Sequence, residues 1–454
     1  MSSRHGRLHP IVGLLAGVLL ATAAPADEPR FTPDQLKTDL AFIASEIRAN
    51  HPEPAHSIDA AAFDREVEAL HANLKTPLTR DQAWAAFATL NPVLADAHLV
   101  VSYPNWRGAA EAHLAAGGTF FPFELNIADD GTPIVTALLG GAPTPFAGRR
   151  IRSIDGVDVR ERTAAVLARA HGDTPAFRAE LASRRWFFLD WKLFGAKADY
   201  EIAFEGEEAP RRITAGRATP TFLADEASFE RQFTFEPLPC GAALLTVSAF
   251  AWPEKPPFLA FTRDAFERIE ASETRTLIID VRANSGGDDD FWMEGLLPYV
   301  ADKPYRHGSG YHKRVLEKYR DADETTGAVV NGEIDGWIQP EPENPLQFDG
   351  KVYVLIGRST YSSAILFSNV MQDFGFGTLA GAAATARAEQ SGSVQQSVLP
   401  NTGLVLVWPR FVLERPSGRA EPVLLTPDVV VEDDPLQPRA AVEALQRRES
   451  AACD

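Results

Sequence analysis

The sequence has 454 residues, of which 45% are hydrophobic and 23% charged, an ordinary composition for a globular protein of two to three domains. Its formal net charge is −18, which argues against nucleic acid and anionic membrane surfaces as partners because both attract basic patches. The two cysteines, Cys240 and Cys453, lie near no histidine and in no CxxC pair, so neither a thiolate metal site nor a catalytic cysteine is indicated. In an oxidising compartment they either form a bridge or stay unpaired, and the sequence leaves both open.

Residues 1–26 have the order of a secretory signal peptide. Arg4 and Arg7 form a positive start, a short apolar run (IVGLLAGVLLATAA) follows, and the small residues that end at Ala26 fit a cleavage site. This run is too short for a comfortable membrane span, and no later stretch approaches the length of a transmembrane helix. We therefore expect an exported mature protein, periplasmic or secreted, that begins near Asp27.

Residues 27–112 are predicted to form a helical region. The first helix has a Thr cap and a Pro in its first turn (TPDQLKTDLAF), a second amphipathic helix starts at Ser57, and a third follows Thr79. The third helix closes on the segment DAHLVVSYP, which contains His98 and turns extended. The first part of the mature chain is therefore predicted to be mostly α-helical.

The rest of the chain changes character twice. Residues 113–235 contain paired β-like runs around DDG and DG turns, which predicts a small mixed β domain. Residues 236–445 alternate buried-strand candidates with helices, and this alternation predicts α/β layering. The polar, turn-rich span 303–348 is expected to be a mobile segment over a site.

A strand, a tight turn and a helix are predicted in the stretch KVYVLIGRSTYSSAILFSNVMQDFG. Ser362 and Ser363 fall where the helix begins, so each is either a helix cap or a nucleophile beside the free N–H groups of the helix end. An earlier strand, LIIDVRANSGG, ends in Gly286 and Gly287, whose backbone N–H groups can face a ligand because no Cβ is in the way. The acidic residues 288–290 that follow are interpreted as solvated surface, and no metal site is predicted.

These motifs, in this order and with TLAG and TPDVVVE after them, resemble the C-terminal processing (tail-specific) serine proteases. The segment AGRRIRSIDGVDVRE is similar to the PDZ-like element of that family, and DAH is similar to the DGH segment of its tricorn-core branch. The resemblance covers nearly all of the mature chain. It implies a crotonase- or ClpP-like α/β catalytic core at 236–445, a PDZ-like domain at 113–235 and an N-terminal helical region at 27–112.

Carried over residue by residue, the resemblance places the nucleophile at Ser362. The N–H of Ser363 would form half of the oxyanion hole, and Gly286 or Gly287 would supply the other half. The Ser–Lys members of the family have a lysine where this chain has Arg387. Arginine stays protonated in proteins and cannot serve as a base, so Arg387 is interpreted as a group that binds substrate.

The tricorn-like branch uses Ser, His and Glu, and His98 falls on its base position. Glu421, in the segment EPVLLTPD, keeps the spacing of the branch's Glu, although the Asn and Gly of that segment are lost. His307 and His312 are rival bases. A neutral His takes the Ser proton, and a carboxylate on its other ring nitrogen fixes the tautomer.

The resemblance therefore implies an exported serine endopeptidase that acts on peptides or protein C-terminal regions, without a cofactor. Its PDZ-like module would receive an extended C-terminus by strand addition. Two alternatives stay open: a non-catalytic ligand- or peptide-binding protein on the same fold, as in the retinoid-binding proteins of the eye, and an esterase-like hydrolase. Substrate identity and oligomeric state are not indicated by the sequence.

Overall fold

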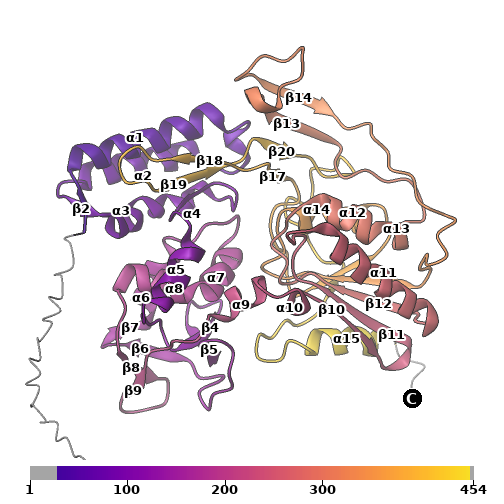
Figure 1. Ribbon diagram of the computed structural model, residues 1–454, viewed down its shortest axis with the longest axis horizontal. Coiled ribbons are helices and arrows are strands. Elements are labelled where there is room, and N and C mark those ends of the chain that lie inside the picture. The colour runs from indigo at the N-terminus through magenta and orange to yellow at the C-terminus, as the bar shows by residue number, and fades with distance from the viewer. Residues whose placement is uncertain (1–27, 450–454) are drawn as a thin grey trace, which may run out of the picture.

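The computed structural model describes residues 28–449, so the predicted signal peptide and Cys453, whose pairing with Cys240 the sequence leaves open, lie outside the described residues. Figure 1 shows three parts: a helical region at upper left, a small β module below it, and a large α/β core on the right. Within residues 28–449, no helix combines the length and apolar character needed to cross a membrane.

The N-terminal region is helical, as predicted. Its elements are β1 (Arg30–Phe31), α1 (Pro33–Asn50), α2 (Ala60–Asn73), β2 (Leu78–Thr79), α3 (Arg80–Phe87), α4 (Asn91–Leu94), β3 (Val100–Ser102) and α5 (Trp106–Ala115), with short 3-10 turns at Pro54–His56 and Ala88–Leu90. Thr32 and Thr79 both cap their helices through a capping box. The second helix begins three residues later than expected, because Asp59 rather than Ser57 accepts the N-terminal hydrogen bond.

The β module consists of two small sheets covered by three helices. Its elements are β4 (Phe123–Ile127), β5 (Pro133–Leu138), β6 (Ile151–Ile154), β7 (Val157–Asp158), α6 (Val159–Leu167), α7 (Pro175–Arg184), α8 (Trp186–Phe194), β8 (Asp199–Phe204) and β9 (Arg211–Thr214). β4 pairs with β5, and the second sheet has the order β7-β6-β8-β9. Large aromatic side chains such as Phe121, Trp186 and Tyr200 are fully buried between these layers and hold the module together.

The core is built on a six-stranded sheet with the order β10-β11-β12-β15-β16-β21. Its strands are β10 (Phe233–Leu238), β11 (Ala242–Val247), β12 (Thr276–Asp280), β15 (Lys351–Leu355), β16 (Thr378–Gly381) and β21 (Val429–Val430). Only the pairing of β10 with β11 is antiparallel. This confirms the predicted α/β layering, in which parallel strands are buried on both faces.

Helices cover both faces of this sheet (Figure 1). The helices of the core and its approach are α9 (Thr221–Glu226), α10 (Phe229–Gln232), α11 (Lys255–Ala271), α12 (Asp289–Gly295), α13 (Leu297–Val300), α14 (Ser363–Asp373) and α15 (Ala440–Glu449), with 3-10 turns at Pro239–Gly241 and Glu317–Tyr319. Alternate residues of β12 point to opposite faces: Ile279 joins the main core, and Ile278 packs in a second cluster with Leu445 of α15.

Two strand groups project from the core. β13 (Gly310–Arg314), β14 (Val329–Glu333), β17 (Gln390–Gly392) and β20 (Phe411–Leu413) form a sheet with the order β14-β13-β20-β17. The span 303–348, expected to be a mobile segment, thus contributes two paired strands to this sheet, and their hairpin reaches outward at the top of Figure 1.

The second group ties the core to the N-terminal region. β18 (Gln395–Val398) and β19 (Val405–Trp408) form a hairpin, and β19 pairs antiparallel with β3. The loop of the hairpin is held by Asp39 of α1, whose carboxylate accepts hydrogen bonds from the backbone N–H groups of Asn401 and Thr402. The sequence analysis assigned these strands to the catalytic core, but their pairing joins two distant parts of the chain.

Candidate active site

Ser362 lies in the turn between β15 and α14, in a strained backbone conformation. Its φ of 55° and ψ of −127° are rare for a residue with a Cβ. The turn is held by hydrogen bonds to the loop after β12: the Thr360 hydroxyl donates to Val281 O (2.8 Å), and Tyr361 N–H donates to Asn284 O (3.1 Å). Ser362 N–H donates to Gln390 Oε1 (3.0 Å), and its hydroxyl makes no capping bond. The side chain is therefore free for chemistry.

Ser363 does not act as the helix cap that the sequence suggested. It is the first residue of α14, and its hydroxyl donates to Asp289 Oδ1 (2.5 Å) while accepting from Trp292 Nε1 (2.9 Å). Burial raises the pKa of Asp289 above its ordinary value, although the bonds from Ser363 and Trp292 oppose this effect. The Ser363 side chain thus anchors the start of α14 and leaves the backbone N–H for another partner.

Gly286 and Gly287 pack directly against the nucleophile turn. A Cβ on Gly286 would lie 2.6 Å from Ser362 Cβ, and one on Gly287 would lie 2.1 Å from Phe250 O, so both positions require glycine. The Gly286 N–H is already donated to Asn284 Oδ1 (2.8 Å). In the part of the chain that is described, the N–H groups of Gly287 and Ser363 have no acceptor. These two, rather than Gly286, are the donors available to an oxyanion.

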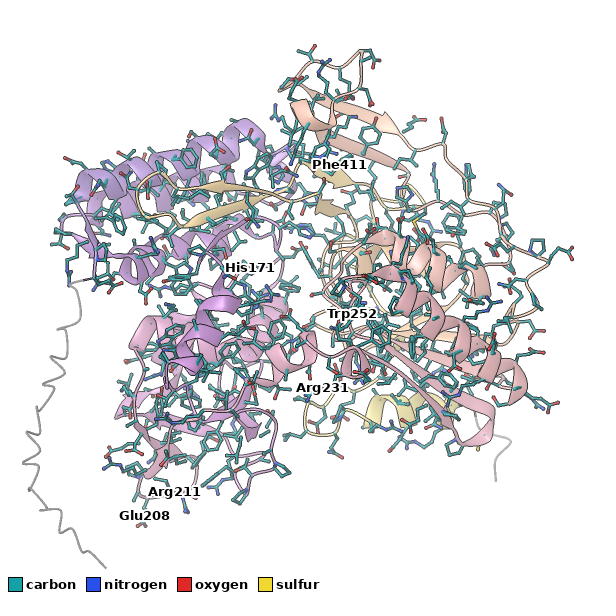
Figure 2. All side chains as sticks on the ribbon, viewed as in Figure 1. His171, Glu208, Arg211, Arg231, Trp252 and Phe411 are labelled. Atoms are coloured by element: carbon teal, nitrogen blue, oxygen red, sulfur yellow. The ribbon has the colours of Figure 1, made fainter. Side chains whose placement is uncertain are left out.

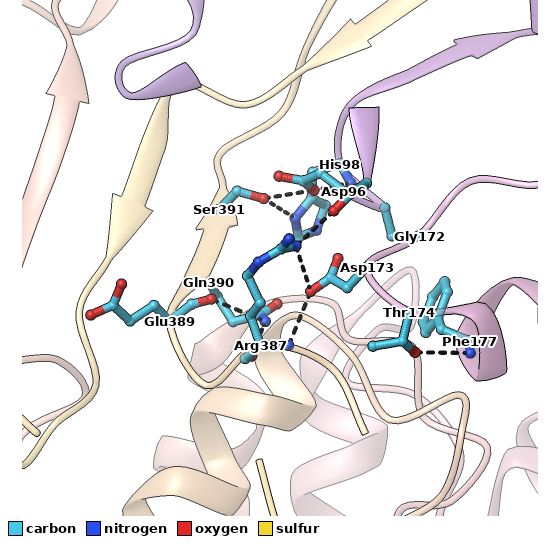
Figure 3. Close-up of polar contacts among 12 residues, drawn as sticks. Asp96, His98, Gly172, Asp173, Thr174, Phe177, Arg387, Glu389, Gln390 and Ser391 are labelled. Atoms are coloured by element: carbon cyan, nitrogen blue, oxygen red, sulfur yellow. Dashed lines mark hydrogen bonds and ion pairs between the residues drawn. The ribbon is translucent and has the colours of Figure 1, made fainter. Parts of the chain in front are cut away.

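His98 lies between α4 and β3, beside the nucleophile turn. Its ring centroid is 5.0 Å from that of Tyr361, the residue that precedes Ser362. His98 N–H donates to Asp96 Oδ1 (2.7 Å), and its ring atom Nδ1 lies 3.0 Å from Ser391 Oγ on β17 (Figure 3). No hydrogen bond joins the ring to the Ser362 hydroxyl among the described residues, and such bonds commonly tighten only when substrate binds.

The hydrogen bonds around Ser391 determine the tautomer of His98. The Ser391 hydroxyl lies 2.9 Å from Asp96 Oδ1, and an ionised carboxylate can only accept, so the single hydroxyl proton points to Asp96. Ser391 Oγ must then accept the second bond, from Nδ1–H of His98. The ring proton is therefore on Nδ1, which leaves the lone pair of Nε2 free to take a proton. The result is a chain of hydrogen bonds from His98 through Ser391 to Asp96.

Asp96 is fully buried and holds several groups in place. Besides the bonds from His98 and Ser391, its Oδ1 accepts from the Tyr361 hydroxyl (3.1 Å), which also lies 2.8 Å from Asp173 Oδ1. Burial raises the pKa of Asp96, but the charges of His98 and His56 outweigh it, and the pKa lies below the ordinary value. Asp96 is thus ionised in the working range of pH.

Asp173 and Arg387 complete the group of charges (Figure 3). Burial and then the charge of Asp96 raise the pKa of Asp173, and Arg387 opposes this shift. Arg387 donates its backbone N–H to Asp173 Oδ2 (3.0 Å), and its Nη1 donates to Ala95 O (2.6 Å) and lies 3.5 Å from the same carboxylate. The guanidinium, expected to bind substrate, is thus engaged with the protein itself.

Burial lowers the pKa of His98 below its ordinary value, and the charges of Asp96 and then Asp173 only partly oppose this effect. His171 is half-buried where the N-terminal region meets the β module (Figure 2), and desolvation of its ring lowers its pKa to about 3. Both rings are accordingly neutral near pH 7, which is the state that a general base requires.

Glu421 is not brought to His98. It is exposed, its Oε2 accepts a hydrogen bond from Val423 N–H (3.2 Å), and within residues 28–449 it has no contact with His98 or Ser391. The place expected of Glu421 is instead occupied by Ser391 and Asp96. The segment after Glu421 pairs with the chain at Arg387 through Leu424, and the Glu421 side chain stays exposed.

The rival histidines lie elsewhere. His312 Nε2 is 3.6 Å from Glu414 Oε1 and 3.9 Å from Glu53 Oε2. His307 acts electrostatically on Asp289, on the α12 side of the nucleophile turn. In residues 28–449 no set of His, Cys, Asp and Glu side chains is arranged to hold a metal ion.

Several groups of this site are not predicted from the sequence. Asp96 belongs to the quoted DAH segment and has a local signal, since it lies two residues before His98. The others follow from tertiary structure and have no local pattern: Tyr361, Asp173, Gln390 and Ser391.

A cavity of about 460 Å³ lies between the β module and the core, and none of the site residues described above lines it. It is lined by β4 and α7, which contribute Leu125 and Arg184, and by the loops after β12 and β15, which contribute Arg282 and Ser359. Ser359 is three residues before Ser362. The cavity therefore opens at the carboxyl ends of parallel strands, where α/β sheets bind ligands.

Comparison with known proteins agrees with this geometry. Residues 243–431 match the model of peptidase family S41, and this span runs from β11 to β21. Over this span, the core of the chain is similar to the serine peptidases of family S41. No curated protein matches the chain in sequence.

Two solved structures of CPAF show the same fold over most of the chain. Mature CPAF complexed with lactacystin is 15% identical over 93% of this chain and 98% of its own, with a TM-score of 0.64. Mature CPAF is 16% identical over 93% and 97%, with a TM-score of 0.61. A photosystem II D1 C-terminal processing protease is 16% identical over 91% and 96%, with a TM-score of 0.47. The CPAF structures identify a mixed α/β fold of the S41 type.

Proposed function

We propose that the protein is an exported serine endopeptidase that cleaves peptides or the C-terminal regions of proteins through an acyl-enzyme. Ser362 is the nucleophile and His98 the base. The observation that carries this proposal is the hydrogen-bonded chain His98–Ser391–Asp96, which leaves Nε2 of His98 unprotonated beside the strained Ser362 turn. Asp96, through Ser391, takes the part that the sequence analysis gave to Glu421.

The mechanism follows from these positions. His98 Nε2 takes the Ser362 proton as the hydroxyl oxygen attacks the substrate carbonyl, and the resulting imidazolium is stabilised by Asp96 through Ser391. The N–H groups of Ser363 and Gly287 stabilise the oxyanion, and removal of one such donor typically costs on the order of 10²–10³ in rate. His98 then protonates the leaving amine, and water repeats the sequence to release the acid.

The β module is proposed to act as the PDZ-like receptor of the substrate chain. β4 has only β5 as a strand partner within the described residues, so its second edge borders α7 and the cavity. Part of that edge is already used, because Ile127 N–H donates to Ser183 Oγ (2.8 Å) and Ile127 O accepts from Arg358 (3.4 Å). A bound strand therefore has room beside Leu125, and the cavity would lead it toward Ser362.

Labelling with a fluorophosphonate probe tests the proposal. We expect one adduct, mapped by mass spectrometry to Ser362, and loss of both labelling and peptide hydrolysis in Ser362→Ala. A folded wild-type protein that is neither labelled nor active on peptides or esters would support the non-catalytic binding protein instead. Turnover of esters without any peptide cleavage would support the esterase-like alternative.

Export is proposed from residues 1–26, which lie outside the described residues. N-terminal sequencing of protein from the periplasm or medium is expected to start near Asp27. An intact Met1 on that protein would contradict the proposal.

A further inference from the structure

Four buried polar atoms of Asp96, His51 and His56 have no hydrogen-bond partner among the described residues. They are Asp96 Oδ2, His51 Nε2 and both ring nitrogens of His56. Buried polar groups are normally paired, so these unpaired groups require an explanation. His51 and His56 both interact electrostatically with Asp96, which ends the hydrogen-bonded chain from His98.

The tautomer of His51 follows from its surroundings. His51 follows the last residue of α1 and is fully buried, and its Nδ1 accepts the N–H of Glu53 at 3.1 Å. The ring proton is then on Nε2, which makes this unpaired atom a donor. Burial lowers the pKa of His51 to about 4, so the ring is neutral near pH 7, and the charge of Asp96 opposes this shift.

Asp96 supplies the matching acceptor. Its Oδ1 is saturated by His98, Ser391 and Tyr361, and only Oδ2 remains open. A buried water that accepts from Nε2–H of His51 and donates to Asp96 Oδ2 would satisfy both atoms, and His56 offers it a third partner. Buried waters typically make about three such bonds.

We propose that His51 is a positioning residue of the proposed catalytic site, which holds Asp96 ionised and oriented through a buried water. The hydrogen-bonded chain then runs from His51 through water, Asp96 and Ser391 to His98. His51 touches neither substrate nor Ser362, and it acts by keeping the Ser391 proton on Asp96 and thereby Nε2 of His98 free. This inference rests on the proposed function of Ser362 and His98.

Other charged and titratable groups act on the same interior. They are His56, His171, Asp173, Tyr361 and Arg387 around Asp96 and His98, Arg314 beside His51, and Glu389 beside His56. The effect of a substitution at His51 on the labelling rate must therefore be compared between variants that leave these other groups unchanged.

The test compares His51→Asn with His51→Gln. The Asn oxygen falls near Nδ1 and keeps the bond from Glu53 N–H but provides no donor at the Nε2 position, whereas the Gln amide provides a donor there. The measured quantity is the second-order rate constant of labelling by a fluorophosphonate probe, followed against pH. Melting temperature and circular dichroism report folding separately.

We expect His51→Asn to lower the labelling rate about tenfold at pH 7 and to move the acid limb of the pH profile upward by about half a unit to one unit, which corresponds to the net free energy of one ordinary hydrogen bond. The ionisation of His98 sets this limb, and it moves upward because Asp96 without its donor attracts the proton on the ring more strongly. His51→Gln should keep the wild-type limb. A merely structural role would lower the melting temperature of both variants and leave the limb unmoved, and that result would overturn the proposal.

A measurement on the wild-type protein covers the case in which neither variant folds. With ¹⁵N-labelled histidine, NMR should show His51 protonated on Nε2, and protonation on Nδ1 would overturn the proposal. The labelling experiments also distinguish a failure of the proposed function from a failure of the proposed role of His51. Labelling that persists in Ser362→Ala refutes the proposed function, whereas labelling that needs Ser362 but is unaffected in His51→Asn refutes only the role of His51.

Discussion

The substitution Asp96→Asn tests the assignment of the third member of the catalytic group most directly. Asparagine keeps the size of the side chain but removes the charge, and its amide carries protons. His98 N–H and Ser391 share Oδ1 of Asp96 as their acceptor. If the amide takes the place of Oδ1, the His98 N–H loses its acceptor, Ser391 accepts from the amide, and the hydroxyl proton turns toward Nδ1 of His98. The ring proton then moves to Nε2, and His98 cannot act as a base.

The expected magnitude follows from two contributions. The wrong tautomer and the lost stabilisation of the imidazolium together typically lower the rate of a serine protease by about 10⁴ when the triad Asp becomes Asn. Here the charge acts through Ser391, so we expect a loss of about 10³–10⁴. Ser391→Ala removes one hydrogen bond and leaves the charge, which corresponds to about 10–100-fold.

Glu421→Gln provides the matched control. Glu421 is exposed and bonds only the backbone N–H of Val423 in the described residues, so its change should alter the rate less than about twofold. The assay is the rate constant of fluorophosphonate labelling at pH 7, with the thermal melt as a check on folding. The reasoning is refuted if Asp96→Asn stays within tenfold of wild type while Glu421→Gln loses more than a hundredfold.

The other predictions concern the remaining groups of the site. His98→Ala should abolish labelling about as fully as Ser362→Ala, since members of such a group act as one unit, and full activity would redirect the search for the base. The labelling rate of the wild type should rise with pH through a midpoint below about 6.5, because burial lowers the pKa of His98 and the neutral ring is the active form; a midpoint near 10 would indicate lysine. Gly286→Ala should prevent correct folding of the nucleophile turn, seen as a lower melting temperature together with lost labelling, because its Cβ would overlap Ser362 Cβ. Arg387→Ala should destabilise the fold by about 1–3 kcal/mol in urea titrations, because it leaves buried Asp173 without its cation; a raised KM for substrates with a free C-terminus, at unchanged stability, would instead indicate substrate binding.

Local sequence patterns were sufficient to predict the strands of the core and the nucleophile turn. The strands that became β11, β12 and β15 are continuous apolar runs, which is the pattern of buried parallel strands, and glycines after β12 mark a close backbone approach. Ser362 could be placed because a strand, a turn and a helix follow in a short stretch. Each of these features is decided within about ten residues of chain.

The rest of the site depends on contacts that no local pattern contains. Ser391 has no motif around it, and it reaches His98 only because β17 leads into the hairpin that pairs with β3. Asp173 lies in the β module and is buried against Arg387, a pairing between distant segments. Glu421 illustrates the opposite error, since spacing alone selected a residue that the structure leaves exposed.

The candidate site is consequently assembled from all three parts of the molecule. His98 and Asp96 come from the N-terminal region, Asp173 from the β module, and Ser362 from the core. Pairing of β3 with β19 fixes the backbone only two residues beyond His98, so the distance between His98 and Ser391 is set by a strand ladder rather than by flexible loops. The Tyr361 hydroxyl, held between Asp96 and Asp173, joins the same three parts at one atom. A change that weakens the β3–β19 pairing, far from Ser362, should therefore break the hydrogen bond between Nδ1–H of His98 and Ser391 and lower activity. It should do so before the core sheet unfolds, because that sheet includes neither strand.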